Sequence, residues 1–137
     1  MVAGLLHENY LNCRSLEHAA MNGNIKNAKF LIDTLKLKQI LLSEFSLLEA
    51  CKNGHLEMAK YLQKELDFGG RNIVGTNRLG ECLVKVCDNG YLEIAEWLVD
   101  TFGIISEDLP MEKSEVVMNL YSQGHAQIAI WINDTIR

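Results

Sequence analysis

Apolar and polar positions follow each other along this chain with the period of an α-helix, and one such pattern recurs four times. In "EACKNGHLEMAK", residues 49–60, a pair of small residues precedes a turn at Asn53-Gly54, and a second apolar stripe follows. Matching surroundings lie around three further glycines. The four turn glycines are Gly23, Gly54, Gly90 and Gly124. Their separations of 31, 36 and 34 residues are typical of stacked supersecondary units.

Each copy predicts a short helix hairpin. Apolar residues seven, four and three positions before the glycine form one helical stripe, and those two, four, five and eight positions after it form a second. The glycine ends the first helix, because it adopts the left-handed conformation without a Cβ clash. Five positions after the glycine, every copy has an alanine: Ala28, Ala59, Ala95 and Ala129. One hairpin of this size cannot bury both stripes, so its stability depends on stacking against neighbours.

The stretches "EACKNGHLEMAKYL" and "KVCDNGYLEIAEWL" resemble the ankyrin repeat, and the resemblance covers about residues 14–136. It implies an all-α fold, an α-solenoid of stacked helix-turn-helix repeats in a single domain, residues 1–137. The approximate units are 12–36, 43–68, 78–104 and 112–137. Of the family's Thr-Pro-Leu-His opening, the four copies keep only a leucine or valine, so we expect short or irregular hairpin fingers; these residues are Leu16, Leu47, Leu83 and Val117. The tetratricopeptide period also fits, but the chain lacks that repeat's Trp/Leu-Gly-Tyr opening and its proline near the end of each unit.

The net charge of the chain and its distribution indicate which kinds of molecule it can bind. With 13 basic and 18 acidic side chains the net charge is −5, which disfavours nucleic acid and anionic membranes. Residues 1–68 are balanced, whereas residues 69–137 carry ten acidic and five basic side chains, which favours a basic partner for that half. The apolar runs are too short to span a membrane, and the start does not resemble a signal peptide. We therefore expect an intracellular, cytoplasmic location.

The residues that could carry chemistry have structural explanations. Cys51 and Cys87 take the place of Ala20, which predicts small, buried, reduced thiols, and no cysteine pair has zinc-knuckle spacing. A weak disulfide or metal pair between Cys82 and Cys87 is left open. The glycine-rich stretch 69–75 lacks the Gly-Lys-Ser/Thr ending of a phosphate loop. We expect no catalytic residues, no metal and no cofactor, and hence no enzyme.

Two features concern packing. The aromatic residue seven positions after each turn glycine is expected to lie in the core between the second helices: Phe30, Tyr61, Trp97 and Trp131. In the last helix Ile130 stands where the other copies have Lys29, Lys60 and Glu96, so this helix is apolar nearly all round. Either Ile130 is covered by a further segment, a second copy or a partner, as a possible oligomer contact, or it turns inward in a distorted helix.

Without a catalytic constellation, surface recognition is the expected function. In ankyrin-like proteins the groove is lined by the fingers and the exposed side of the first helices. This register assigns partner binding to His18, Met21, Asn22, Glu49, Lys52, Asn53, Lys85, Asp88, Asn89, Asn119, Ser122 and Gln123. The mixed polar surface suits a protein or peptide partner, with Phe45 and Met21 as apolar anchors. The alternative is a self-assembling structural or regulatory repeat that uses its apolar C-terminal end.

Overall fold

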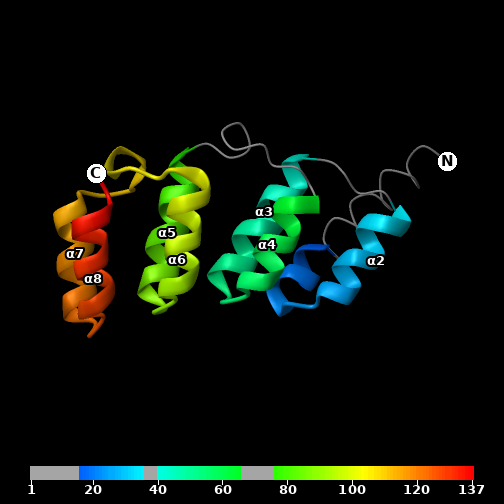
Figure 1. Ribbon diagram of the computed structural model, residues 1–137, viewed down its shortest axis with the longest axis horizontal. Coiled ribbons are helices and arrows are strands. Elements are labelled where there is room, and N and C mark those ends of the chain that lie inside the picture. Colours follow the sequence, from blue (N-terminus) through cyan, green and yellow to red (C-terminus); the bar gives the residue numbers. More distant parts are fainter. Residues whose placement is uncertain (1–15, 36–39, 66–75) are drawn as a thin grey trace. The chain divides into compact units, whose positions relative to one another are not determined.

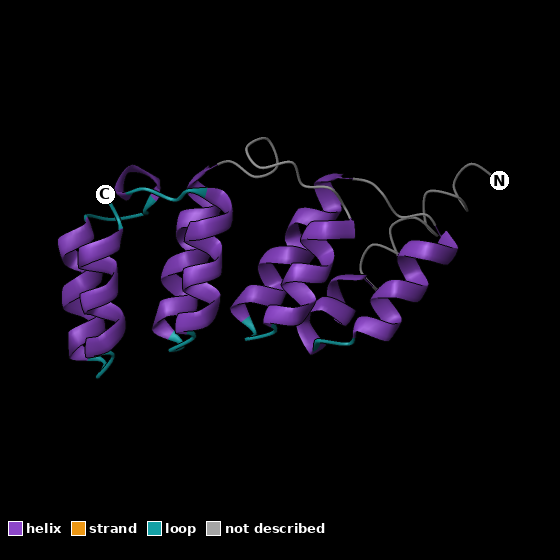
Figure 2. Cartoon of the chain, in the orientation of Figure 1, coloured by secondary structure: helices purple, strands orange, loops and turns teal. Residues whose placement is uncertain are grey.

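The computed structural model describes residues 16–35, 40–65 and 76–137, and in these residues it consists of helices joined by turns and short connections (Figures 1 and 2). Side chains at 34–35, 40–45 and 76–77 are not described, which includes Phe45. The chain divides into two compact units, Met1–Gly69 and Gly70–Arg137, and each is described by itself. None of the helices in the described ranges is both long and apolar enough to cross a lipid bilayer.

The first unit contains two helix hairpins. Helical residues 16–22 precede α2 (Ile25–Leu35), and α3 (Ile40–Lys52) precedes α4 (Leu56–Glu65). In the second hairpin, α3 and α4 run side by side (Figure 1). The first helix of each pair is the one that carries the small residues of the sequence pattern.

The second unit also contains two hairpins. α5 (Thr76–Asp88) pairs with α6 (Leu92–Phe102), and α7 (Lys113–Ser122) pairs with α8 (Ala126–Thr135). The α5 and α7 helices also contact each other, so the two hairpins stack (Figure 1). The 3₁₀ turn η1 (Ser106–Asp108) lies in the connection between them and packs on α5.

All four turns close in the same way, which confirms the role predicted for the glycines. Gly23, Gly54, Gly90 and Gly124 have φ between 69° and 87°, in the left-handed region. At Gly54 the backbone N–H donates to Cys51 O at 3.2 Å, and the next N–H donates to Ala50 O at 2.9 Å. The same pair of bonds recurs at the other three turns. This is the Schellman arrangement, which satisfies carbonyl groups that the end of the helix leaves unpaired.

The core of each hairpin follows the repeated pattern. The alanines five positions after the glycines are completely buried, and so are the small residues Ala20, Cys51 and Cys87. Because these side chains are small, neighbouring helices can approach closely. None of the described cysteines Cys51, Cys82 and Cys87 is in a disulfide, so the Cys82–Cys87 disulfide left open above does not form. Cys13 lies outside the described residues.

The expectation of an aromatic core between the second helices is wrong. Phe30 is 61% exposed, and the other three rings are half-buried. The seventh position lies at the flank of the buried stripe, where only one side of a large ring meets the core. In α6, Trp97 covers Phe102 with its ring edge-on, at 5.9 Å between centroids.

The described connection between the third and fourth hairpins contains no strand. Ile105 N–H donates to the Asp108 carboxylate at 3.0 Å, and Ile104 and Leu109 anchor the connection in the core. It passes so close to α5 that a Cβ on Gly80 would overlap the carbonyl oxygen of Asp108. This irregular, closely packed turn agrees with the short or irregular fingers expected from the sequence. The glycine-rich stretch 69–75 lies outside the described residues.

Candidate functional site

The residues predicted to bind a partner lie in the last turn of the first helix of each hairpin or directly after it. All twelve are exposed or half-exposed, and half of them lie in each unit. Their position follows from the sequence: the Schellman turn at each glycine fixes where the first helix ends, and the buried stripe determines which side faces out. The structure places these residues together within each hairpin.

In the first unit, local contacts occupy part of this surface. The Glu49 carboxylate lies 3.8 Å from Lys52 Nζ, a partly exposed ion pair of the kind that contributes little to stability. The Asn53 side chain donates to Glu49 O at 2.7 Å, so it helps to cap α3. Asn53 therefore has a structural role besides any contact with a partner.

The first hairpin carries a shallow surface pocket of about 320 Å³. It includes two predicted partner-binding residues, His18 and Asn22, together with the exposed ring of Phe30. The remaining lining residues are Ala19, Asn24, Asn27 and Leu31. Amide and imidazole groups beside an apolar ring are suited to hydrogen bonding with a peptide. Sequence reasoning did not identify Asn24, Asn27 and Phe30 as part of this surface.

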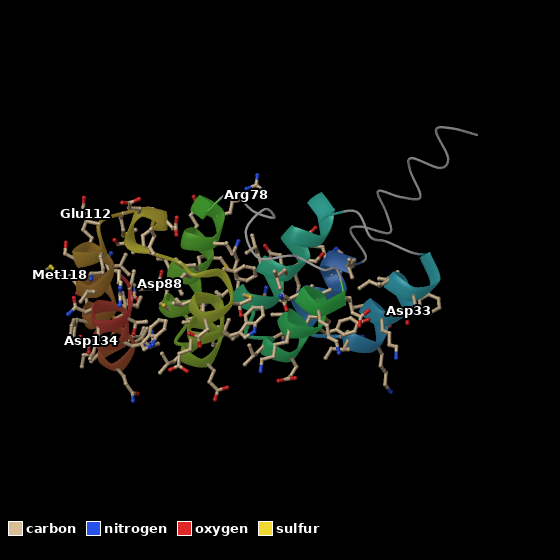
Figure 3. All side chains as sticks on the ribbon, turned by 45° about the horizontal axis from the view of Figure 1, so that its top comes forward. Asp33, Arg78, Asp88, Glu112, Met118 and Asp134 are labelled. Atoms are coloured by element: carbon tan, nitrogen blue, oxygen red, sulfur yellow. The ribbon has the colours of Figure 1, made fainter. Side chains whose placement is uncertain are left out.

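In the second unit, Lys85, Asp88 and Asn89 are exposed at the end of α5. The backbone oxygen of Asp88 lies 3.1 Å from Nε2 of His125, which begins the second half of the next hairpin. The His125 ring also lies over the turn, 3.2 Å from where a Cβ on Gly90 would stand. This contact fixes the end of α5, where Asp88, labelled in Figure 3, is exposed.

The predicted residues of α7 make mostly local bonds. The Ser122 hydroxyl donates to Met118 O at 3.0 Å within the same helix. The Asn119 side chain lies 3.9 Å from the sulfur of Met111, and Gln123 N–H donates to Asn119 O at 3.0 Å. These contacts leave the α7 residues exposed but partly committed to their own helix.

Cys87 and Tyr61 are described groups with clearly shifted pKa values, and neither is one of the predicted partner-binding residues. Burial, reinforced by the charges of Asp88 and Cys82, raises the pKa of the Cys87 thiol to about 12, so this thiol is protonated and unreactive near neutral pH. Burial also raises the pKa of Tyr61, with smaller effects from Glu65 and Asp33. Among the described residues, no three His, Cys, Asp or Glu side chains gather as metal ligands would.

Comparison with models of protein families shows which family this chain belongs to. The model of the ankyrin repeats, in three copies, matches residues 16–109, which is more than half of the chain. The chain belongs to the ankyrin-repeat family. The all-α repeat fold expected from the sequence is thereby confirmed. No curated protein and no solved structure matches the chain.

Membership brings a general function with it. Ankyrin repeats are generally protein–protein interaction modules and are typically non-catalytic. The family match ends at Leu109, before α7. The last hairpin nevertheless has the same left-handed glycine and the same pair of turn bonds as the others.

Ile130 on α8 is 51% exposed. The alternative in which it turns inward in a distorted helix is therefore wrong. Whether Ile130 contacts a second copy stays a prediction. Two other exposed apolar side chains, Met118 and Tyr121 on α7, were not identified from the sequence as a surface. The sequence did contain a sign of this surface, because Tyr121 stands at the position where the other copies have small residues, Ala20, Cys51 and Cys87.

Proposed function

We propose that this ankyrin-repeat chain is a non-catalytic adaptor that binds a protein or peptide partner through the exposed residues at the ends of its first helices. The observation that supports this most directly is the exposure of all twelve positions on helices whose opposite stripe is buried. The side chains are amides, imidazole and charges of both signs, which suit hydrogen bonds and ion pairs with a polar protein surface. No nucleic acid or membrane is required.

The binding surface differs in charge between the units. The first unit offers the Glu49–Lys52 pair and the amide-lined pocket at His18, whereas the second lies in the acidic half of the chain. A partner with a basic segment facing the second unit is therefore favoured. We assign the protein to the reducing interior of the cell, in the cytoplasm, because buried cysteines that form no disulfide, as in the described part of this chain, are typical of that compartment.

The proposal is tested by affinity capture followed by titration of the captured protein against purified variants. Lys52→Glu and Asp88→Lys reverse one charge of the surface in each unit. The matched controls Lys29→Glu and Glu96→Lys reverse exposed charges on second helices. We expect at least one surface variant to weaken binding about ten-fold, and both controls to bind like the parent, with unchanged circular dichroism and thermal unfolding. Equal affinity for all four variants would contradict the proposal.

A second candidate function, self-assembly through the C-terminal hairpin, is favoured by one observation, the exposure of Ile130. An exposed isoleucine in place of Lys29, Lys60 and Glu96 is an apolar contact available to a second copy. Light scattering of Ile130→Lys against the parent tests this. A parent dimer that dissociates in the variant would support self-assembly, and unchanged mass with unchanged stability would remove it.

A further inference from the structure

The open side of α7 differs from the equivalent side of the other first helices. Three positions before the turn glycine, the first three copies have side chains that are completely buried: Ala20, Cys51 and Cys87. The fourth copy has Tyr121, and it is 51% exposed. Within the second unit the comparison is direct, because the α5 helix that carries Cys87 is followed by a stacked hairpin, whereas α7 is the first helix of the last described hairpin.

Tyr121 is too large for the close approach that this position allows elsewhere. An alanine or cysteine lets the next helix pack tightly, and a phenol ring in the same place would hold a neighbouring repeat away. Any hairpin that packed on α7 at the spacing of α5 and α7 would have to accommodate this ring. The open side of α7 therefore presents an apolar surface that the equivalent side of α5 lacks.

Met118 enlarges this apolar surface. It stands three residues before Tyr121, on the adjoining side of the helix, and is 69% exposed. The corresponding residue of the second copy, Leu48, is only 4% exposed. In Figure 3, Met118 projects from the side of α7 away from α5. We call Met118 and Tyr121 the end patch.

Acidic side chains border the end patch without a described counter-charge. Glu112 and Glu115 are exposed at one-turn spacings before Met118, and neither forms an ion pair with a described side chain. The ammonium group of Lys113, in the same turn, instead donates to Ile136 O at 2.9 Å and to Asn133 O at 3.4 Å, at the end of α8. Its charge is directed at that helix terminus rather than at the end patch.

We propose that the end patch is a second interaction surface, which binds a segment of another protein that presents an apolar side chain close to a lysine or arginine. The apolar residue covers Met118 and Tyr121, and the cation pairs with Glu115 and Glu112. An exposed aromatic residue beside a flexible methionine is typical of binding surfaces. The charge complement excludes an acidic partner and disfavours a second copy of this chain, because the second unit carries the whole net charge of −5.

The test is selection of a displayed library of random 16-residue peptides against the full chain, followed by titration of the synthesised winners. We expect winners that combine apolar residues with lysine or arginine. Met118→Glu and Tyr121→Ala should each weaken their binding at least ten-fold, and Glu115→Lys should weaken it several-fold. Replacing the peptide's lysines by glutamate should restore binding to the Glu115→Lys variant. Ile105→Glu, which alters an exposed apolar residue in the connection before η1, is the control and should bind like the parent.

Other results would overturn the proposal. These are winners without basic residues, winners whose binding ignores the Met118 and Tyr121 variants, and selection that yields no binder. A parent dimer that Tyr121→Ala dissociates in sedimentation equilibrium would show that the occupant is a second copy. The surface proposed for the adaptor function is tested separately, with the variants Lys52→Glu and Asp88→Lys. Either proposal can therefore fail without the other.

Discussion

Replacing Gly80 by alanine should destabilise the second unit although the substitution lies inside a helix. In an exposed helix interior, alanine is favoured over glycine by about 1 kcal/mol. At Gly80, however, the new Cβ would overlap the carbonyl oxygen of Asp108 and lie 3.1 Å from Leu109 Cα. Both atoms are backbone, so the clash cannot be relieved by a side-chain rotation. The connection that carries η1 has to move away from α5.

The magnitude follows from what that connection buries. Leu109 is 8% exposed and Ile104 is 3% exposed, and burying each such side chain contributes about 1.5–3 kcal/mol. Losing the burial of one of them, offset by about 1 kcal/mol of helix propensity, leaves a net loss of about 0.5–2 kcal/mol. Displacement would also strain the bond from the Ser106 hydroxyl to Arg137 O, 2.7 Å long.

The assay is urea unfolding followed by circular dichroism, with Gly103→Ala as the matched control. Gly103 also has a positive φ, 64°, but nothing lies within 4 Å of its added Cβ. The control should therefore lose only the cost of a left-handed alanine, about 1 kcal/mol, without exposing the connection. Gly80→Ala should in addition speed amide exchange at Ile105 and Asp108. A Gly80→Ala chain as stable as the parent, or more stable, would refute the reasoning.

Three further predictions concern the second unit. His125→Ala should lower the free energy of unfolding by about 1 kcal/mol, because it removes the partner of Asp88 O. The control His18→Ala, at an exposed site, should change this free energy little. Chemical denaturation measures both. Lys113→Met keeps the apolar stem but removes two bonds to the end of α8, and should speed amide exchange near Ile136 while leaving exchange in α6 unchanged. Burial holds the pKa of Cys87 at about 12, above the ordinary 9.0, so the folded state binds its proton more tightly. Stability present below pH 9 should therefore be lost as the pH rises toward 12, by about 1.4 kcal/mol per pH unit, and Cys87→Ala should flatten this part of the pH profile.

The parts of the fold that repeat in the sequence were the parts that could be predicted from it. A glycine that must adopt a left-handed conformation and an alanine that must be buried recur at the same positions in every copy of the sequence. In the structure, Gly54 has a positive φ and Ala59 is buried, as that pattern predicts. Gly80 gave no such signal. Its close neighbour is the backbone of Asp108, 28 residues further on, in a connection whose sequence does not recur in the other copies.

The aromatic residues show a second limit of the pattern. Four large rings at one register predicted a shared environment, yet Phe30 is 61% exposed while Trp97 is half-buried. At the edge of the apolar stripe of a helix, the register alone does not determine whether a side chain is buried or exposed. Its burial depends on which side chain lies beside it, and only α6 supplies Phe102 as a neighbour for Trp97.

The surroundings of the turn glycines differ between the last hairpin and the others. Gly23 and Gly90 must be glycine for two reasons, their positive φ and a histidine ring from the next hairpin, which would lie 2.6 Å and 3.2 Å from an added Cβ. At Gly124 no described atom lies within 4 Å of an added Cβ, so the described residues give only the positive φ as a reason for glycine there. Tyr121 marks a related difference on α7, because it is large and 51% exposed where the corresponding Cys87 of α5 is small and completely buried. The turn itself requires the glycine in every copy, whereas a small side chain three positions earlier is required only where another helix packs closely on it.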